Sequence, residues 1–147
     1  MEKQDIIFGG YEQVSLPELG IVQIVAKIDT GAYTGAIHCK EVKEIVRDTD
    51  GSRYLRIVMP GEESKIIEIV DYKLIRVRSS SGHVRKRYLI NTNIAINGLA
   101  YRTRIGLTDR SNMDYEILIG RRFLRENNII VDVRRNSEYD KEKELEL

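Results

Sequence analysis

Short segments rich in β-branched residues, each ended by a turn, recur along most of this chain. Three pairs of such segments flank a turn, which is the pattern of β-hairpins. The pairs are residues 53–59 and 65–70, residues 72–78 and 84–90, and residues 91–96 and 99–106 around Asn97-Gly98. Consecutive hairpins must bury one face of each strand against other strands, and this favours a β-barrel.

The remaining segments fit the same class. Strands are predicted at 6–8, 21–28, 40–47, 116–120 and 129–133, a helix at 121–128, and an irregular segment at 14–20. Asp50-Gly51 predicts a further hairpin turn between 40–47 and 53–59. Residues 40–47 also fit a brief helix, because their apolar positions match neither period cleanly. We predict an all-β fold: a closed or partly open β-barrel with one short helix over residues 1–135, then a charged, loosely ordered C-terminal tail over 136–147.

Composition indicates one globular domain. The chain has 147 residues, of which 41% are hydrophobic and 32% are charged. Its apolar runs are far shorter than the ~20 residues of a membrane helix, and no secretory signal follows the charged start at Met1. A single cysteine, Cys39, excludes an intramolecular disulfide. These features predict a cytoplasmic protein without membrane contact.

The net charge of +1 hides an uneven distribution. Residues 72–135 contain 14 Lys and Arg but 5 Asp and Glu. Such a basic block attracts an acidic partner, either nucleic acid or an acidic peptide. A solvated charged face without any partner explains the same counts.

The stretch Asp29-Thr30-Gly31 follows the apolar segment 21–28 and places a carboxylate at a strand end. Glycine lets the backbone turn tightly enough for its N–H to reach that carboxylate. Two such carboxylates within hydrogen-bond distance share one proton, so one can activate water while the other polarises a carbonyl. The chain holds one Asp-Thr-Gly, so this chemistry requires a symmetric dimer with Asp29 of each copy at the two-fold axis. A tight turn without catalytic function fits the same three residues.

Two stretches together resemble the signatures of the retropepsin-like aspartic peptidases. They are Ile28-Asp29-Thr30-Gly31-Ala32 and Ile117-Leu118-Ile119-Gly120-Arg121 with the short helix after it. The sequence is most similar to a bacterial and archaeal family often labelled ATP-dependent zinc proteases, of the RimK-associated type. The closer similarity adds Ser80-Ser81-Gly82, Arg87 and residues 113–124, and it covers residues 14–133.

The resemblance implies a retropepsin-like acid-protease barrel and an aspartic endopeptidase. It implies that Asp29 is the catalytic carboxylate, that Thr30 and Gly31 support it, and that Gly120 and Arg121 brace the turn from beneath. The residues expected to bind substrate are Ala32, Ser80, Ser81, Gly82 and Arg87. We also expect the hairpin tip 79–83 to close over the substrate.

The expected partners are a second copy of the chain and a peptide or protein substrate. Family members often accompany ATP-grasp ligases that append amino acids such as glutamate to peptides, which implies an association with such a ligase. By charge alone, an acidic or glutamate-modified peptide suits a basic face formed by Arg76, Arg78, Arg85, Lys86 and Arg87.

Neither a cofactor nor a metal is expected, although the family label names both zinc and ATP. There is no His-Glu-x-x-His and no phosphate-binding Gly-x-x-x-x-Gly-Lys loop, and Asp29, His38, Cys39 and His83 show no metal-ligand spacing. Two other functions stay open. One is a non-catalytic barrel whose basic block 72–135 binds RNA or an acidic protein tail, and the other is a metal-dependent hydrolase.

Overall fold

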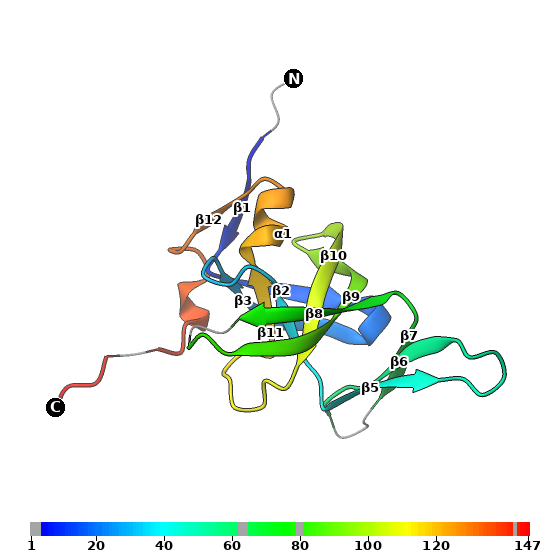
Figure 1. The fold of residues 1–147 in the computed structure, drawn as a ribbon. Coiled ribbons are helices and arrows are strands. Elements are labelled where there is room, and N and C mark those ends of the chain that lie inside the picture. Colours follow the sequence, from blue (N-terminus) through cyan, green and yellow to red (C-terminus); the bar gives the residue numbers. More distant parts are fainter. Residues whose placement is uncertain (1–3, 62–64, 79–80, 143) are drawn as a thin grey trace.

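Strands dominate the computed structural model, which describes residues 4–61, 65–78, 81–142 and 144–147 (Figure 1). The strands are β1 (Ile6–Gly9), β2 (Tyr11–Leu16), β3 (Ile21–Asp29), β4 (Ala36–His38), β5 (Glu41–Val46), β6 (Arg53–Val58), β7 (Ile66–Ile69), β8 (Tyr72–Arg78), β9 (Val84–Ile96), β10 (Leu99–Thr108), β11 (Ile117–Gly120) and β12 (Ile129–Asp132). The helices are α1 (Arg121–Glu126) and the 3-10 turns η1 (Pro17–Leu19) and η2 (Ser137–Tyr139). None of these helices in the described residues has the length and hydrophobicity of a membrane-crossing segment.

The main sheet closes into a barrel. Its strand order is β10-β4-β11-β3-β2-β9-β8, and β9 also pairs with β10, which joins the ring. The antiparallel β9–β10 pair runs from Leu99 opposite Ile96 to Leu107 opposite Tyr88 around the predicted Asn97-Gly98 turn. The all-β class, the ring and the short α-helix are therefore as predicted.

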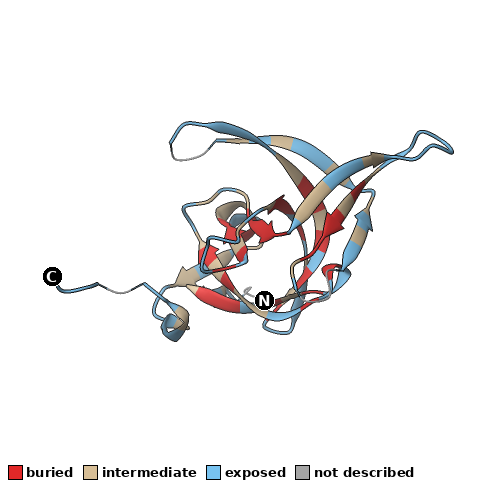
Figure 2. Cartoon of the chain, turned by 90° about the horizontal axis from the view of Figure 1, so that it is seen from below, coloured by how far each residue is buried: buried red, intermediate tan, exposed pale blue. Residues whose placement is uncertain are grey.

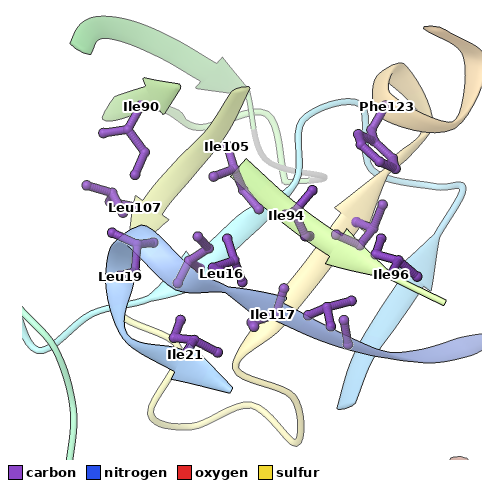
Figure 3. Packing of buried hydrophobic residues seen from close by; sticks show 14 of the residues in the cluster. Leu16, Leu19, Ile21, Ile90, Ile94, Ile96, Ile105, Leu107, Ile117 and Phe123 are labelled. Atoms are coloured by element: carbon purple, nitrogen blue, oxygen red, sulfur yellow. The ribbon is translucent and has the colours of Figure 1, made fainter. Parts of the chain in front are cut away.

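Side chains pointing into this ring form the core. On β9 the alternation of a strand brings Ile90, Ile94 and Ile96 inward with 1% or less of their surface exposed. Ile105 and Ile117 meet them from β10 and β11 (Figure 3). Each fully buried side chain of this size stabilises the fold by about 1.5–3 kcal/mol. In Figure 2 the buried residues gather around the barrel, whereas the ends of the projecting hairpins are exposed.

A second sheet of three antiparallel strands, β5-β6-β7, packs beside the barrel. Leu55 and Ile57 of β6 are fully buried in the common hydrophobic cluster. The segment 40–47 is thus a strand rather than a helix. Its apolar pattern did not decide between the two, and its pairing with β6 satisfies its backbone hydrogen bonds as a strand. The predicted hairpins on either side of β6 are confirmed.

Strand β9 serves two hairpins. Residues 84–90 and 91–96, predicted as separate strands, form one strand of 13 residues that pairs with β8 along its first half and β10 along its second. In the view of Figure 1 the paired β8–β9 arm crosses in front of the barrel. Its tip includes Ser79 and Ser80, which lie outside the described residues.

The register of β8 and β9 corrects the predicted basic face. Arg76 lies opposite Lys86, whereas Arg87 lies opposite Ile75 and Arg85 opposite Val77. Directly opposed residues share a face and neighbours along a strand alternate, so Arg85 and Arg87 are on the other side of the hairpin from Arg76 and Lys86. Sequence spacing within each strand could not give this offset, because the loop determines the register.

The segment 14–20, predicted to be irregular, is a strand followed by a 3-10 turn. β2 pairs with β3 through a register shift between Val14 and Leu16, and both residues are buried. The register shift disrupts the alternation of buried and exposed residues by which a strand is identified from its sequence. Gly20 ends the turn with a φ of 70°.

The first and last strands of the chain pair with each other. β1 pairs in parallel with β12, with Ile6 opposite Ile129. The segment predicted as a loosely ordered tail, 136–147, begins with the η2 turn. Asn136 Nδ2 donates hydrogen bonds to the Tyr11 carbonyl oxygen at 2.7 Å and to Glu12 Oε2 at 2.8 Å. The start of this segment is therefore attached to β2.

Candidate active site

Asp29 is the last residue of β3, and Gly120 is the last residue of β11. The two strands are parallel neighbours, with Asp29 opposite Gly120. Residues that are 91 positions apart in the sequence are thereby side by side at one end of the barrel. The structure thus brings together the two stretches that carry the family resemblance.

The Asp29 side chain is held by the turn that follows it. The Gly31 N–H donates to Asp29 Oδ1 at 2.9 Å, and the Ala32 N–H donates to the Asp29 carbonyl at 3.2 Å. Asp29 is half-buried and its second oxygen, Oδ2, makes no hydrogen bond within the described residues. One carboxylate oxygen is therefore fixed while the other is left for a substrate, a water molecule or a second carboxyl group. Thr30 and Gly31 are exposed.

The start of α1 fastens the same turn from beneath. The backbone N–H of Arg121 donates to Ala32 O at 2.7 Å, and that of Arg122 donates to Tyr33 O at 3.1 Å. The Arg121 guanidinium donates to Gly31 O at 3.1 Å. The first N–H groups of a helix have no acceptor within the helix, and here the carbonyl oxygens of the turn accept them.

Glycine is required at two positions of this contact. A Cβ on Gly120 would lie 2.6 Å from the Tyr33 carbonyl oxygen, and one on Gly35 would lie 2.5 Å from the Leu118 carbonyl oxygen. Both obstacles are backbone atoms that cannot turn away. The close approach of the 30–35 loop to β11 therefore depends on the absence of a side chain.

A cleft of about 850 Å³ lies between the 31–36 loop and the β8–β9 arm. It is lined by Gly31, Ala32, Tyr33, Thr34, Ala36, Ile75, Arg76, Val77, Arg78, Arg87, Leu89, Arg110, Met113, Leu118, Arg121 and Arg122. Six of these residues are arginines and none is acidic. The cleft therefore presents apolar walls and a strongly positive field.

The predicted substrate-binding residues are only partly brought together. Ala32 and Arg87 line the cleft. Ser81 and Gly82 are exposed at the hairpin tip and do not line it, and Ser80 lies outside the described residues. The cleft wall is formed by the body of β8 and β9.

Arg110 is a site residue that the sequence interpretation missed. It lines the cleft and also a smaller cavity of about 120 Å³ that contains Asp29. Its Nε donates to the Tyr115 carbonyl oxygen at 3.0 Å, and its backbone N–H donates to His38 Nδ1 at 2.8 Å. Arg110 belongs to the polar loop just before the stretch Ile117–Arg121. Its place in that loop was the one sequence feature that could have pointed to it.

Burial and neighbouring charges lower the pKa values of two arginines in the site, Arg110 and Arg87. Burial lowers the pKa of Arg110, the Arg87 charge lowers it further, and the Asp29 carboxylate opposes both. Burial also lowers the pKa of Arg87, with a further contribution from Arg85. Both guanidinium groups are thus partly removed from water.

His38 and Cys39 lie behind this site in the packed interior. His38 Nδ1 accepts the Arg110 N–H, so a neutral His38 carries its proton on Nε2. Burial raises the pKa of the Cys39 thiol to about 11. Among the described residues, no group of three His, Cys, Asp or Glu side chains is arranged to hold a metal ion.

Comparison with known proteins gives consistent similarities. The family model described as "Retropepsin-like aspartic endopeptidase RimB" matches residues 7–142. A solved structure of a Legionella pneumophila protein of unknown function superposes with a TM-score of 0.69 at 26% identity, covering 89% of this chain and 95% of that one.

Curated relatives carry a different name. A Shewanella halifaxensis protein named "Probable alpha-L-glutamate ligase" is 31% identical over 135 residues, which is 90% of this chain and 29% of that protein. A Desulfotalea psychrophila protein of the same name is 29% identical, again over 29% of its length. The chain thus spans less than a third of these longer relatives. Because the family model matches nearly the whole chain, the protein belongs to the RimB-like family of retropepsin-like aspartic endopeptidases.

Proposed function

We propose that the protein is an aspartic endopeptidase that works as a homodimer. The observation that carries this proposal is the Asp29 carboxylate at the end of β3, held through Oδ1 by the Gly31 N–H. Asp29 lines a small cavity that shares Arg110, Met113 and Leu118 with the large cleft. The family match supports the same chemistry. A second carboxyl group is needed, and Asp29 of the partner subunit supplies it at the two-fold axis.

In this mechanism the two carboxyl groups share one proton. The ionised carboxylate takes a proton from water while the water oxygen bonds to the peptide carbonyl carbon, and the protonated carboxyl donates its proton to the carbonyl oxygen. The C–N bond then breaks and the leaving nitrogen takes up a proton. The brace from Gly120 and Arg121 keeps the reacting oxygen in place during these steps.

We propose acidic or glutamate-modified peptides as substrates. The cleft contains six arginines and no acidic residue, so a peptide bearing several carboxylates gains charge complementarity along its length. Relatives named as glutamate ligases support this substrate class. They also support a functional association between this protein and a ligase that adds glutamate to peptides.

Substitution of Asp29 tests the catalytic role. The Asp29→Asn variant should fold but lose all detectable hydrolysis of an acidic peptide library, followed by mass spectrometry. Asp48→Asn is the matched control, because Asp48 is exposed near the β5–β6 turn and makes the same charge change far from the cleft. Undiminished cleavage by Asp29→Asn would refute an aspartic mechanism.

The dimer can be tested separately. Activity per chain should rise with protein concentration over the range where sedimentation shows monomers associating into dimers. Constant activity per chain in a solution shown to be monomeric would exclude a site shared between two copies.

A non-catalytic binding module is the second candidate, and the ligase names favour it. The chain matches about 29% of the length of those relatives, as an accessory domain of a longer enzyme would. The domain would then hold an acidic protein tail or RNA in the arginine-lined cleft without cleaving it. Binding to RNA through several phosphates should weaken steeply as salt rises. Absence of RNA binding at low salt would leave only the protein tail.

A further inference from the structure

Two half-buried arginines of the cleft, Arg87 and Arg110, have no carboxylate partner among the described residues. Five exposed or half-exposed arginines lie within 3.5 Å of a carboxylate: Arg47, Arg53, Arg102, Arg122 and Arg134. Arg87 and Arg110 have no ion pair among the described residues, although both are half-buried. Taking a guanidinium out of water without a counter-ion is costly, so a bound anion would stabilise both side chains.

Arg87 is held in the cleft by packing. Its side chain lies over Gly106, where an added Cβ would come within 2.5 Å of Arg87 Cδ. The guanidinium makes no hydrogen bond within the described part of the chain, and Leu89 and Ile75 are cleft neighbours. Its aliphatic stem is therefore fixed while its donors remain unused.

Arg110 is held by hydrogen bonds instead. Nε is bonded to Tyr115 O, and the backbone is bonded to His38. Within the loop, the Met113 N–H donates to Arg110 O at 2.9 Å. The two terminal nitrogens, Nη1 and Nη2, have no partner in the described residues, so a forked pair of donors is left in a fixed position.

The two cations are neighbours. Arg87 and Arg110 line the same cleft, and Arg110 also lines the smaller cavity that contains Asp29. The Arg87 charge contributes to lowering the pKa of Arg110, and the Asp29 carboxylate opposes that effect. Two like charges held together in a partly dry cleft repel each other, and an anion between them would relieve that repulsion. Arg76 and Arg78 differ, because they are exposed on the outer part of the arm and water solvates them.

We infer that Arg87 and Arg110 form a subsite that binds the side-chain carboxylate of the substrate residue next to the cleaved bond. This inference rests on the proposed function, because that function places the cleaved bond next to Asp29. It adds the residues that determine which substrate side chain is accepted. Arg110 borders both the Asp29 cavity and the cleft, so an anion bound there is adjacent to the reacting carbonyl. The subsite discriminates glutamate or aspartate from their amides, because an amide leaves the two cations uncompensated.

The test separates binding from hydrolysis. The full-length Asp29→Asn variant is titrated calorimetrically with the tripeptide Glu-Glu-Glu and with Gln-Gln-Gln, and Glu-Glu-Glu should bind at least about tenfold more tightly. Adding Arg87→Gln should remove most of that preference. The guanidinium of Arg87 makes no hydrogen bond in the described structure, so this variant should fold normally.

Two further variants distinguish the subsite from the general positive charge of the cleft. Arg110→Lys keeps the charge but loses the fork, and it should weaken Glu-Glu-Glu binding by several-fold. Arg104→Gln removes one charge from an exposed position outside the cleft and should change binding less than about twofold. Circular dichroism and thermal unfolding check that each variant is folded.

The possible results are distinct. Equal loss with Arg87→Gln and Arg104→Gln would show a general charge effect and overturn the subsite, as would equal affinity for the two tripeptides. Tighter binding of a short single-stranded RNA than of Glu-Glu-Glu would also overturn it. A selective loss of Glu-Glu-Glu binding with Arg87→Gln would support the subsite, and absence of hydrolysis by the protein with Asp29 intact would then count against the peptidase alone.

Discussion

Gly120 lies directly opposite Asp29 in the parallel pairing of β11 with β3, and a side chain at position 120 would begin 2.6 Å from the Tyr33 carbonyl oxygen. The turn after Asp29 and the strand beside it therefore touch through backbone atoms. This contact positions the turn, and the Gly31 N–H of that turn holds Asp29 Oδ1.

Replacing Gly120 with alanine should destabilise the protein by about 1–3 kcal/mol, because the new methyl group meets three backbone atoms that cannot rotate away. Urea unfolding followed by circular dichroism measures the free energy of unfolding. Gly10→Ala is the control, since a Cβ there would make an ordinary contact at 3.9 Å. Equal stability of the two variants would mean that the turn is not packed against β11 as described.

Gly106→Ala should separate stability from function. The added Cβ would meet the flexible Arg87 side chain at 2.5 Å, so Arg87 moves and the backbone does not. We expect a change of less than about 1 kcal/mol in the free energy of unfolding, together with a loss of Glu-Glu-Glu binding similar to that of Arg87→Gln. Unchanged binding would show that the position of Arg87 over Gly106 does not matter for the anion.

Asn136→Gly should destabilise the protein by about 1–3 kcal/mol, because the buried Glu12 carboxylate loses one of its two amide donors. Glycine keeps the left-handed backbone, in which Asn136 has a φ of 59°, so the side-chain loss is isolated. Asn128→Gly, at a φ of 53° with no side-chain hydrogen bond among the described residues, is the matched control. A cost of the same size for both substitutions would mean that the bond to Glu12 contributes nothing.

The Cys39 thiol should resist modification in the folded protein. Its pKa of about 11 exceeds the ordinary value of 9.0 because the side chain is buried. The pKa of Cys39 is higher in the folded than in the unfolded protein, so the protonated thiol favours the folded state. This contribution to stability is fully present below pH 9 and is lost as the pH rises toward about 11. Reaction with a thiol reagent at about pH 8 should be slow in buffer and fast in urea, and equal rates would show an exposed thiolate.

Local chemistry in the sequence was enough to predict several parts of the fold. Asn97-Gly98 determines a tight turn by itself, since both residues adopt the positive φ that such turns require. The hairpins around β6 and the short helix after Gly120 follow from similar local signals. The strand β2 was missed because its register shift at Val14 and Leu16 removes the alternation on which such a prediction depends.

The site divides in the same way. Asp29, Gly31, Gly120 and Arg121 could be named in advance, because the two stretches that contain them resemble the signatures of the retropepsin-like aspartic peptidases. Arg110 could not, since its importance comes from neighbours such as Arg87 and Asp29 that are distant in sequence. The tip residues Ser81 and Gly82 were assigned to the cleft, and the structure instead places them outside its lining.

The sequence by itself determined the strand class and the turns, because these depend on backbone preferences of neighbouring residues. Asp29 was selected through the family resemblance of its stretch. Only the tertiary structure decided which face of the hairpin Arg85 and Arg87 share, and that Arg87 and Arg110 line the same cleft. Register, burial and the distance between charges are set by packing across the barrel. A linear pattern of residues does not encode them directly.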